Sequence, residues 1–547
     1  MTDANCVYFI FTSINGGNDF VFIDGRTLPQ GAKVSADVCI IGTGPAGITL
    51  ARNIASDKVS VICIESGGME PDVATQDLTK GDSVGLPYYP LETTRLRYFG
   101  GTTGHWGGYC RPLYPIDFEK RDWVPQSGWP ISYLAVAEYY PAAQEICDLG
   151  PFDYALAGWQ LPNFPPLPLG GNEVQTRLIQ FSPPTRFNTK YRDEFTRSKR
   201  VTVYLNANVA SIDASANAKE IVGLAVKTLS GNRFSVRARI YVLAAGGIEN
   251  VRLLLASSQV TQHGLANDRD NVGRYFCEHM QLDSAAVLPL RQNTSYDLYQ
   301  PETRHKPFEP VTPGSPIGLM GYLTFTDEAQ RAGRILNYSA NVQHSYWSDY
   351  FLHSDRTHDS ADESRWQALG SAIATVWHNL KDAGSMAWER LPGKKSPGFY
   401  KIVTSQEQAP NRDSRVLLSN STDALGIRRA SLDWRLNELD RHTITHALRQ
   451  IGSAFGSAGL ARLQVPIDFA KDSWPAYIRG SWHHCGGTRM SESPDAGVVD
   501  SDCKVHGIGN LYVAGASVFP TNGHGNPTLT VVALALRMAA HIRGVLR

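Results

Sequence analysis

The chain has 547 residues, of which 42% are hydrophobic and 19% charged, and its 52 Lys and Arg residues balance its 52 Asp and Glu residues. Because one hydrophobic core stops growing at ~250–300 residues, we expect at least two domains. The balanced charge provides no positive field that would attract nucleic acid or an anionic membrane, so we predict neither as a partner.

The N-terminal segment and the cysteines bear on location. No run approaches the ~18 consecutive apolar residues of a membrane span. Residues 1–23 contain an apolar run at 6–11 but lack a basic region and a small-residue cleavage site, so we interpret them as an extra strand or an irregular start rather than a signal peptide. The eight cysteines are scattered without CxxC spacing, which argues against disulfide scaffolds and metal sites and predicts a cytoplasmic protein.

A strand, a glycine turn, a helix and a second strand are predicted near the start. An apolar run, Asp37–Ile41, is followed by the glycine-rich turn Gly42–Gly47, a helical pattern through Ile54 and a second apolar run, Val59–Ile64. Largely apolar strands suit a parallel sheet that is covered on both faces. The unit is typical of a Rossmann-type dinucleotide-binding domain.

The glycines of this turn have distinct expected roles. Gly42 permits the turn, Gly44 lets the backbone approach a pyrophosphate at the helix N-terminus, and Gly47 allows the helix to pack closely on the strand. Glu65 ends the next strand ~20 residues further on, where it would accept hydrogen bonds from a ribose diol. The alternative is a glycine turn with a chance acidic residue, and the motif alone does not separate FAD from NAD.

The rest of the chain suggests two interleaved domains. Strand patterns at Val201–Leu205 and Arg233–Leu243 return to the nucleotide-binding sheet, whereas residues 290–470 contain longer polar strands and a helical stretch near 363–391. We therefore predict a discontinuous nucleotide-binding domain and a substrate-binding domain. Their expected ranges are 20–110, 200–290 and 470–547 for the first, and 111–199 and 291–469 for the second.

Several segments resemble the glucose-methanol-choline (GMC) oxidoreductases. Residues 510–521 and 525–530 resemble the closing signature of that family, and Trp482–Met490 resembles its catalytic-histidine segment. Tyr98–Gly108 and Ala244–Glu249 add further similarity, so the resemblance spans nearly the whole chain. Within the family, the chain is most similar to pyranose oxidases and to bacterial sugar or glycoside 3-oxidases and dehydrogenases.

The resemblance implies a fold and a cofactor. The fold is α/β, or α+β overall, with a Rossmann-type FAD-binding domain and a substrate domain built on an antiparallel sheet with helices, as in p-hydroxybenzoate hydroxylase. The cofactor is FAD, with no metal. The implied FAD contacts are Gly42, Gly44, Ala46, Gly47, Glu65, Ser66, Gly101, Thr102, His105, Trp106, Val209, Ala245, Gly246, Gly515, Ala516, Asn526, Pro527 and Thr528.

His105 and His524 each have two possible roles. In fungal pyranose oxidases the histidine at the place of His105 is covalently joined to the flavin, but the flanking Thr103 and Gly104 differ here, and a structural histidine beside Trp106 is an equal alternative. His524 lies in a glycine loop, where it either packs in the loop or contacts substrate.

The catalytic pair implied by the resemblance is His484 and Asn526. A hydroxyl group becomes a good hydride donor once its proton is removed, and a neutral imidazole at physiological pH is a suitable base. His484 would take this proton while Asn526 holds the hydroxyl. Neighbours on a strand face opposite sides, so His483 is the alternative base, and Asn526 could instead cap the following helix with Pro527 at its first position.

The resulting functional prediction is oxidation of a secondary hydroxyl of a pyranose sugar or glycoside to a keto-sugar, at carbon 3 or carbon 2. The electron acceptor would be oxygen, a quinone or a separate redox protein. The alternatives are oxidation of a non-sugar alcohol, such as a polyol, a steroid or a natural-product carbinol, and a non-redox lyase on the same fold.

Overall fold

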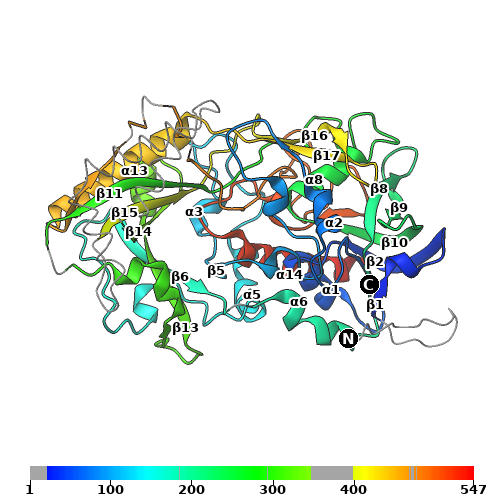
Figure 1. Ribbon diagram of the computed structural model, residues 1–547, viewed down its shortest axis with the longest axis horizontal. Coiled ribbons are helices and arrows are strands. Elements are labelled where there is room, and N and C mark those ends of the chain that lie inside the picture. Colours follow the sequence, from blue (N-terminus) through cyan, green and yellow to red (C-terminus); the bar gives the residue numbers. More distant parts are fainter. Residues whose placement is uncertain are drawn as a thin grey trace, which may run out of the picture.

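The computed structural model describes residues 21–183, 185–291, 294–346, 398–466, 468–469, 473–475 and 477–547. Two large sheets lie at opposite ends of the elongated molecule, and the C-terminal helix runs through the centre (Figure 1). The predicted helix near 363–391 and the apolar run at 6–11 lie outside the described residues.

The first sheet has eight strands in these ranges, in the order β1-β7-β3-β2-β10-β9-β8, with β19 also paired to β10. The neighbouring strands β1, β7, β3, β2 and β10 are parallel, and β19 is parallel to β10. The strands β9 and β8 extend the sheet with antiparallel pairing. The predicted strand, turn, helix and strand form β2, α1 (Pro45–Ile54) and β3, with β2 and β3 side by side. The bounds are β1 (Phe22–Asp24), β2 (Ala32–Ile41), β3 (Val61–Ile64), β7 (Val201–Leu205), β8 (Asn208–Ala214), β9 (Ile221–Lys227), β10 (Arg233–Leu243) and β19 (Leu511–Val513).

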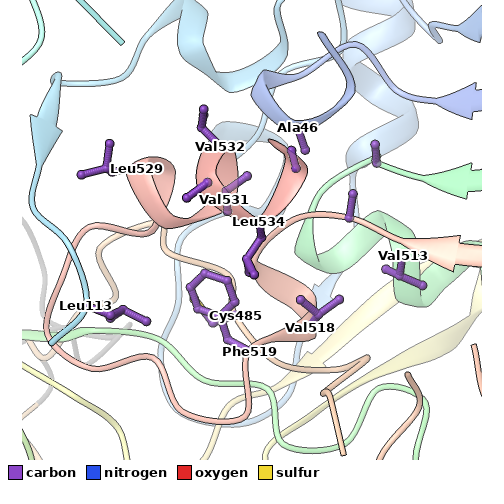
Figure 2. Close-up of a cluster of buried hydrophobic side chains, with 14 of the residues drawn as sticks. Ala46, Leu113, Cys485, Val513, Val518, Phe519, Leu529, Val531, Val532 and Leu534 are labelled. Atoms are coloured by element: carbon purple, nitrogen blue, oxygen red, sulfur yellow. The ribbon is translucent and has the colours of Figure 1, made fainter. Parts of the chain in front are cut away.

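The C-terminal helix α14 (Pro527–Val545) is the core helix of this half. It packs against α1 and α5 (Tyr140–Ile146), and Figure 2 shows its apolar side chains gathered with Ala46, Leu113 and Phe519. By length and composition α14 is the one helix of the described residues that is apolar enough to cross a membrane, and 61% of that apolar window is buried inside the protein. Its apolar surface is therefore largely used in packing.

The second sheet is antiparallel throughout the described strands, in the order β18-β11-β15-β14-β13-β6-β5, with β12 beside β13. The helix α13 (Glu438–Ser457), whose N-terminus is capped by the Asn437 side chain, packs against this sheet. The bounds are β5 (Tyr109–Cys110), β6 (Val174–Phe181), β11 (Met280–Pro289), β12 (Pro307–Phe308), β13 (Ile317–Phe325), β14 (Tyr338–Tyr346), β15 (Gly398–Gln406) and β18 (Ala461–Gln464).

A small third sheet packs against α8 (Gly247–Ala256) on the side of the first sheet (Figure 1). It contains β16 (Arg415–Thr422), β17 (Arg428–Asp433) and β4 (Asp82–Ser83). The remaining described α-helices are short: α2 (Val73–Gln76), α3 (Pro115–Phe118), α4 (Leu134–Ala137), α6 (Phe187–Lys190), α7 (Arg192–Thr196) and α9 (Asp327–Gly333).

The strand pairing differs from the expected domain ranges at several places, one of them β5, which lies in the range 20–110 but pairs with β6 of the second sheet. The segment 200–290 was assigned to the nucleotide-binding domain, but β11 pairs with β15 and β18 of the second sheet. The segment 291–469 was assigned to the substrate domain, but β16 and β17 pack beside α8.

Candidate active site

A cavity of about 620 Å³ lies where the carboxyl ends of the first-sheet strands face the second sheet. The segments after β2, β3, β10 and β19 all line it, as expected for a ligand site in a parallel sheet. Every sequence-predicted contact residue lines this cavity except Gly47.

The glycine turn has the geometry that the sequence predicted. Gly42 has a φ of 102°, and a Cβ on Gly47 would lie 2.0 Å from the Gly42 carbonyl oxygen, so Gly47 serves the packing of α1 on β2. A Cβ on Gly44 would meet nothing within 4 Å because it would point into the cavity. Gly44 is the N-cap residue of α1 and no side chain caps this helix end, which leaves its amides open to an anion.

Glu65 is buried and tied to the same turn. Its Oε2 accepts hydrogen bonds from the Thr43 amide at 3.0 Å and the Thr43 hydroxyl at 2.6 Å, and its Oε1 accepts one from the Gly67 amide at 3.0 Å. The carboxylate therefore fixes the turn while it lines the cavity.

An arginine cluster that the sequence analysis missed lines the cavity near Thr94. Glu249 forms ion pairs with Arg97 at 2.7 Å, with Arg252 at 2.9 Å and with Arg95 at 3.6 Å. Burial lowers the pKa of Arg95 to about 10, although the nearby carboxylate of Glu249 acts to raise it. The Nε and Nη1 atoms of Arg95 are buried without a hydrogen-bond partner. Arg95 and Arg97 thereby add positive charge to the cavity lining.

Asn526 pairs with His483 in the structure, and not with His484. The Asn526 Nδ2 atom lies 3.2 Å from His483 Nε2, and His483 Nδ1 lies 2.7 Å from Nδ1 of His279. Asn526 is the N-cap residue of α14, yet its side chain makes no capping hydrogen bond. The Asn526 amide therefore contacts the imidazole of His483 and leaves the helix end uncapped.

His484 also lines the cavity, but its hydrogen bond goes to a different group of residues. Its Nε2 lies 3.0 Å from the Tyr88 hydroxyl, which in turn donates to the carboxylate of Glu278, and its ring packs against Phe276. Burial lowers the pKa of His484 to about 3 and raises that of Glu278 to about 7. No described hydrogen bond joins His484 to Asn526, and His484 instead contacts Tyr88 and, at 3.9 Å, Glu278, so its predicted role as the base stays a prediction.

The register of the two paired segments explains why His483 and His484 have different partners. Cys277 and Cys485 form an antiparallel bridge through two backbone hydrogen bonds of 2.9 and 3.0 Å. Counting outward from that bridge places Glu278 opposite His484 and His279 opposite His483, on alternate faces. The alternation was anticipated, but its phase depends on this bridge and on Trp482, whose φ of 61° breaks the strand just before the histidines.

Aromatic side chains surround His105 at the cavity. The rings of His105 and Trp482 stack with centroids 5.5 Å apart, and Tyr89 meets Trp482 edge-on. His105 Nε2 is buried without a hydrogen-bond partner, and burial lowers the pKa of this histidine. Trp106 instead donates its Nε1 proton to the Thr185 carbonyl, which is a structural contact.

The second sheet supplies a polar wall. On β14, alternate residues face the cavity, and neighbours on β11 and β15 extend the same face. Asn341 Oδ1 on this wall is buried without a partner. The wall residues are Gln281, Ser339, Asn341, Gln343 and Ser405.

Arg111 adds a charged side chain to the cavity lining beside this polar wall. It is buried, it lies over the ring of Tyr322, and its Nη2 donates to the His524 carbonyl oxygen and to Ser339 Oγ. His524 itself is buried between Tyr114 and Tyr322 and does not line the cavity, which favours loop packing for it.

Comparison with known proteins agrees with this geometry. Residues 410–535 match the family described as GMC oxidoreductase. This C-terminal part of the chain belongs to the GMC oxidoreductase family. A C-glycoside 3-oxidase of Microbacterium trichothecenolyticum is 38% identical over 326 residues, which cover 57% of this chain and 48% of that protein. A 2-methyl-1,2-propanediol dehydrogenase of Mycolicibacterium austroafricanum is 23% identical over 92% of this chain and 95% of its own length.

Among solved structures, a formate oxidase variant of Aspergillus oryzae RIB40 superposes with a TM-score of 0.54 at 17% identity, over 95% of this chain and 99% of that one. This similarity shows the fold. The predicted resemblance and fold class are thereby confirmed. The family match and the oxidase and dehydrogenase relatives show an FAD-dependent oxidoreductase that acts on CH–OH groups.

The residues present fit FAD. The uncapped N-terminus of α1, the open space at Gly44 and the buried Glu65 suit the adenosine diphosphate part, and the uncapped N-terminus of α14 suits a ring that gains negative charge on reduction. When bound, the flavin supplies an acceptor for the substrate hydride. This chain's own residues must supply the base.

Two glycine variants separate cofactor binding from folding. We expect Gly44→Ala to fold and to hold flavin about tenfold more weakly, since its Cβ occupies cavity space and tenfold corresponds to ~1.4 kcal/mol. We expect Gly47→Ala to destabilise the fold, because its Cβ meets a backbone carbonyl. The flavin-to-protein ratio and the melting temperature measure the two effects, and a Gly44→Ala protein with normal flavin affinity would contradict the assignment.

Proposed function

We propose that this GMC oxidoreductase oxidises a ring CH–OH group of a pyranose sugar or glycoside to a ketone, at carbon 3 or carbon 2. The observation that carries the proposal is the His483–Asn526 pair, which faces a wall of uncharged amide and hydroxyl side chains across one cavity. FAD is the cofactor, and a cytoplasmic location remains a prediction from the cysteine pattern.

His483 is the proposed base. Its Nε2 lies within hydrogen-bond distance of an amide donor, so this nitrogen presents a lone pair to the cavity. A substrate hydroxyl would take the place of the Asn526 amide at Nε2 and transfer its proton there. Asn526 would then hold the hydroxyl oxygen and orient its carbon. Proton transfer to a positioned base typically raises the reaction rate by ~10²–10⁴-fold, and orientation of the substrate raises it further.

The polar wall supports a polyhydroxylated substrate. Amide side chains both donate and accept hydrogen bonds, which matches vicinal hydroxyl groups. Trp482 and Tyr89 add aromatic surface at the cavity, and Trp482 is 42% exposed. The C-glycoside 3-oxidase relative supports carbon 3 of a sugar ring.

A second candidate is oxidation of a non-sugar polyol, which the diol dehydrogenase relative favours. The relatives are oxidases and dehydrogenases, which argues against a non-redox lyase. Oxygen, a quinone and a separate redox protein all stay open as acceptors.

A substrate panel tests the proposal. Monosaccharides, aryl glycosides and small diols would be supplied anaerobically to the flavin-loaded protein, with bleaching of the flavin absorbance as the signal and NMR of the products to locate the ketone. Repeating turnover with oxygen and with a dye identifies the acceptor class. Bleaching by diols and by none of the sugars would overturn the sugar assignment.

The pH dependence follows from the burial of the base. Burial, then the nearby His279, Arg111 and His484, hold the pKa of His483 well below its ordinary value of 6.5. The base must be neutral, so it stays competent as the pH falls through 6.5. We expect the acid limb of kcat/KM to lie below pH 6.5, and a limb at or above pH 7 would contradict a buried neutral base.

The flavin linkage at His105 has two interpretations on this geometry. The unpartnered, buried Nε2 suits a covalent bond, whereas the stacking on Trp482 suits a structural histidine. The intact mass of the denatured protein separates them, because a covalent bond adds the mass of one FAD that His105→Ala removes.

A further inference from the structure

His279 lies behind the proposed base and outside the cavity. It is 1% exposed, and its ring meets that of His483 edge-on with centroids 4.9 Å apart. Neither the family resemblance nor any motif in the sequence singled it out.

The partners of His279 determine its tautomer. Its Nε2 lies 2.9 Å from the Gly523 carbonyl oxygen and 3.2 Å from that of Asn522. A carbonyl oxygen only accepts hydrogen bonds, so Nε2 must carry the proton. Burial, reinforced by Arg111, lowers the pKa of His279 to about 4, so the ring is neutral at pH 7 and its Nδ1 is a bare acceptor.

The tautomer of His483 follows from that of His279. Since the two Nδ1 atoms lie 2.7 Å apart and that of His279 accepts, His483 Nδ1 must donate a proton. A neutral imidazole carries one N–H, so His483 Nε2 is left with its lone pair. The Asn526 amide donates to that nitrogen, which is consistent with this assignment.

We propose that His279 is a positioning residue that fixes His483 in the Nδ1–H tautomer and so presents the Nε2 lone pair to the substrate hydroxyl. When the substrate O–H bond breaks and its proton moves to Nε2, His483 becomes an imidazolium whose Nδ1–H remains hydrogen-bonded to His279. The two peptide carbonyls of 522–523, on the loop that leads to Asn526, thereby set the proton position at the base. This inference rests on the proposed function of His483.

Other titratable groups near His279 and His483 do not provide the hydrogen-bond acceptor at His483 Nδ1. Arg111 and the neutral His484 and His524 face the pair from neighbouring segments, and Glu407 lies further off. Arg111 is a cation that disfavours the imidazolium, and His484 is held by Tyr88. Within the described residues, His279 provides the acceptor at His483 Nδ1.

Two isosteric substitutions test the proposal. His279→Asn places its Oδ1 where the Nδ1 acceptor stands but is too short to reach the 522–523 carbonyls, whereas His279→Gln reaches the carbonyls but lacks an acceptor at the Nδ1 position. We expect kcat to fall by less than about tenfold in His279→Asn and by on the order of 10²-fold in His279→Gln, with KM little changed. A purely structural role predicts the opposite order, because Gln keeps the backbone contact.

A second readout does not depend on turnover. In ¹⁵N-histidine-labelled protein at neutral pH, the His483 Nε2 resonance should have the shift of an unprotonated nitrogen in the unsubstituted protein and in His279→Asn, and the shift of a protonated one in His279→Gln. Equal activities and an unprotonated Nε2 in both variants would overturn the proposal. Full activity in His483→Ala would instead overturn the proposed function, so the two failures are distinguishable.

Discussion

Replacing His483 by alanine is expected to lower kcat by about 10²–10⁴-fold while flavin stays bound, because the substrate hydroxyl then has no base at the cavity. His483 lines the cavity, its Nε2 is the atom that Asn526 contacts, and the substitution leaves unchanged the glycine turn, Glu65 and the N-terminus of α14, which would hold the cofactor. Single-turnover reduction of the flavin by substrate measures the loss directly, since it excludes the acceptor step.

The neighbouring histidine provides a matched control. His484→Gln can keep a donor toward the Tyr88 hydroxyl, and the described hydrogen bond of His484 is to Tyr88 and not to Asn526. We expect this variant to lose less than about tenfold in the same assay, with any loss arising from displacement of the segment that carries both histidines. A loss in His484→Gln as large as in His483→Ala would return the role of base to His484.

The sequence predicted the nucleotide-binding half well because its signals are local. An apolar strand, a turn that only glycine can form and an acidic strand end lie within 30 residues, and the structure confirms β2, α1 and β3 in that order. The same holds for the residues that follow β10 and β19, since glycines mark the end of each strand. Of the contacts, Gly47 alone lies outside the cavity, for the packing reason that was expected of it.

The catalytic side was predicted less accurately because it depends on long-range register. Both His483 and His484 line the cavity, and which of them contacts Asn526 is set by the bridge between Cys277 and Cys485, which are 208 residues apart in the numbering, and by the left-handed backbone at Trp482. The positions of His279 and of the β14 wall likewise follow from strand pairing that no local pattern encodes. The Glu278–His279 pair preceding a strand was visible in the sequence, but nothing marked it as opposite the histidine segment.

A buried ion pair holds the cavity wall in place. Arg121 and Glu407 form a bidentate pair with N–O distances of 2.9 and 2.6 Å, and both side chains are 0% exposed. The Asn337 amide groups, which precede β14, also donate to Glu407. Burial, with the nearby Glu407, raises the pKa of Asp117 to about 7, whereas for Glu407 itself Arg121 and the hydrogen bonds outweigh burial and lower the pKa.

Replacing Arg121 by methionine should therefore destabilise the fold strongly. Removing one partner of a buried pair typically costs about 3–5 kcal/mol, because the other charge is left uncompensated. Without the cation, the folded-state pKa values of Glu407 and Asp117 both rise above their unfolded values. Groups with raised pKa values contribute stability at low pH and lose it as the pH rises through the folded values, near 7 for Asp117.

The decrease in melting temperature caused by Arg121→Met should accordingly be larger at pH 8 than at pH 5.5. The double variant Arg121→Met with Glu407→Gln removes both charges, so it should recover part of the loss at pH 8 and show a weaker pH dependence. Thermal unfolding followed by flavin release and by circular dichroism measures both. A loss that is the same at both pH values, or a double variant that is no better than the single one at pH 8, would mean that Arg121 acts through packing rather than through its charge.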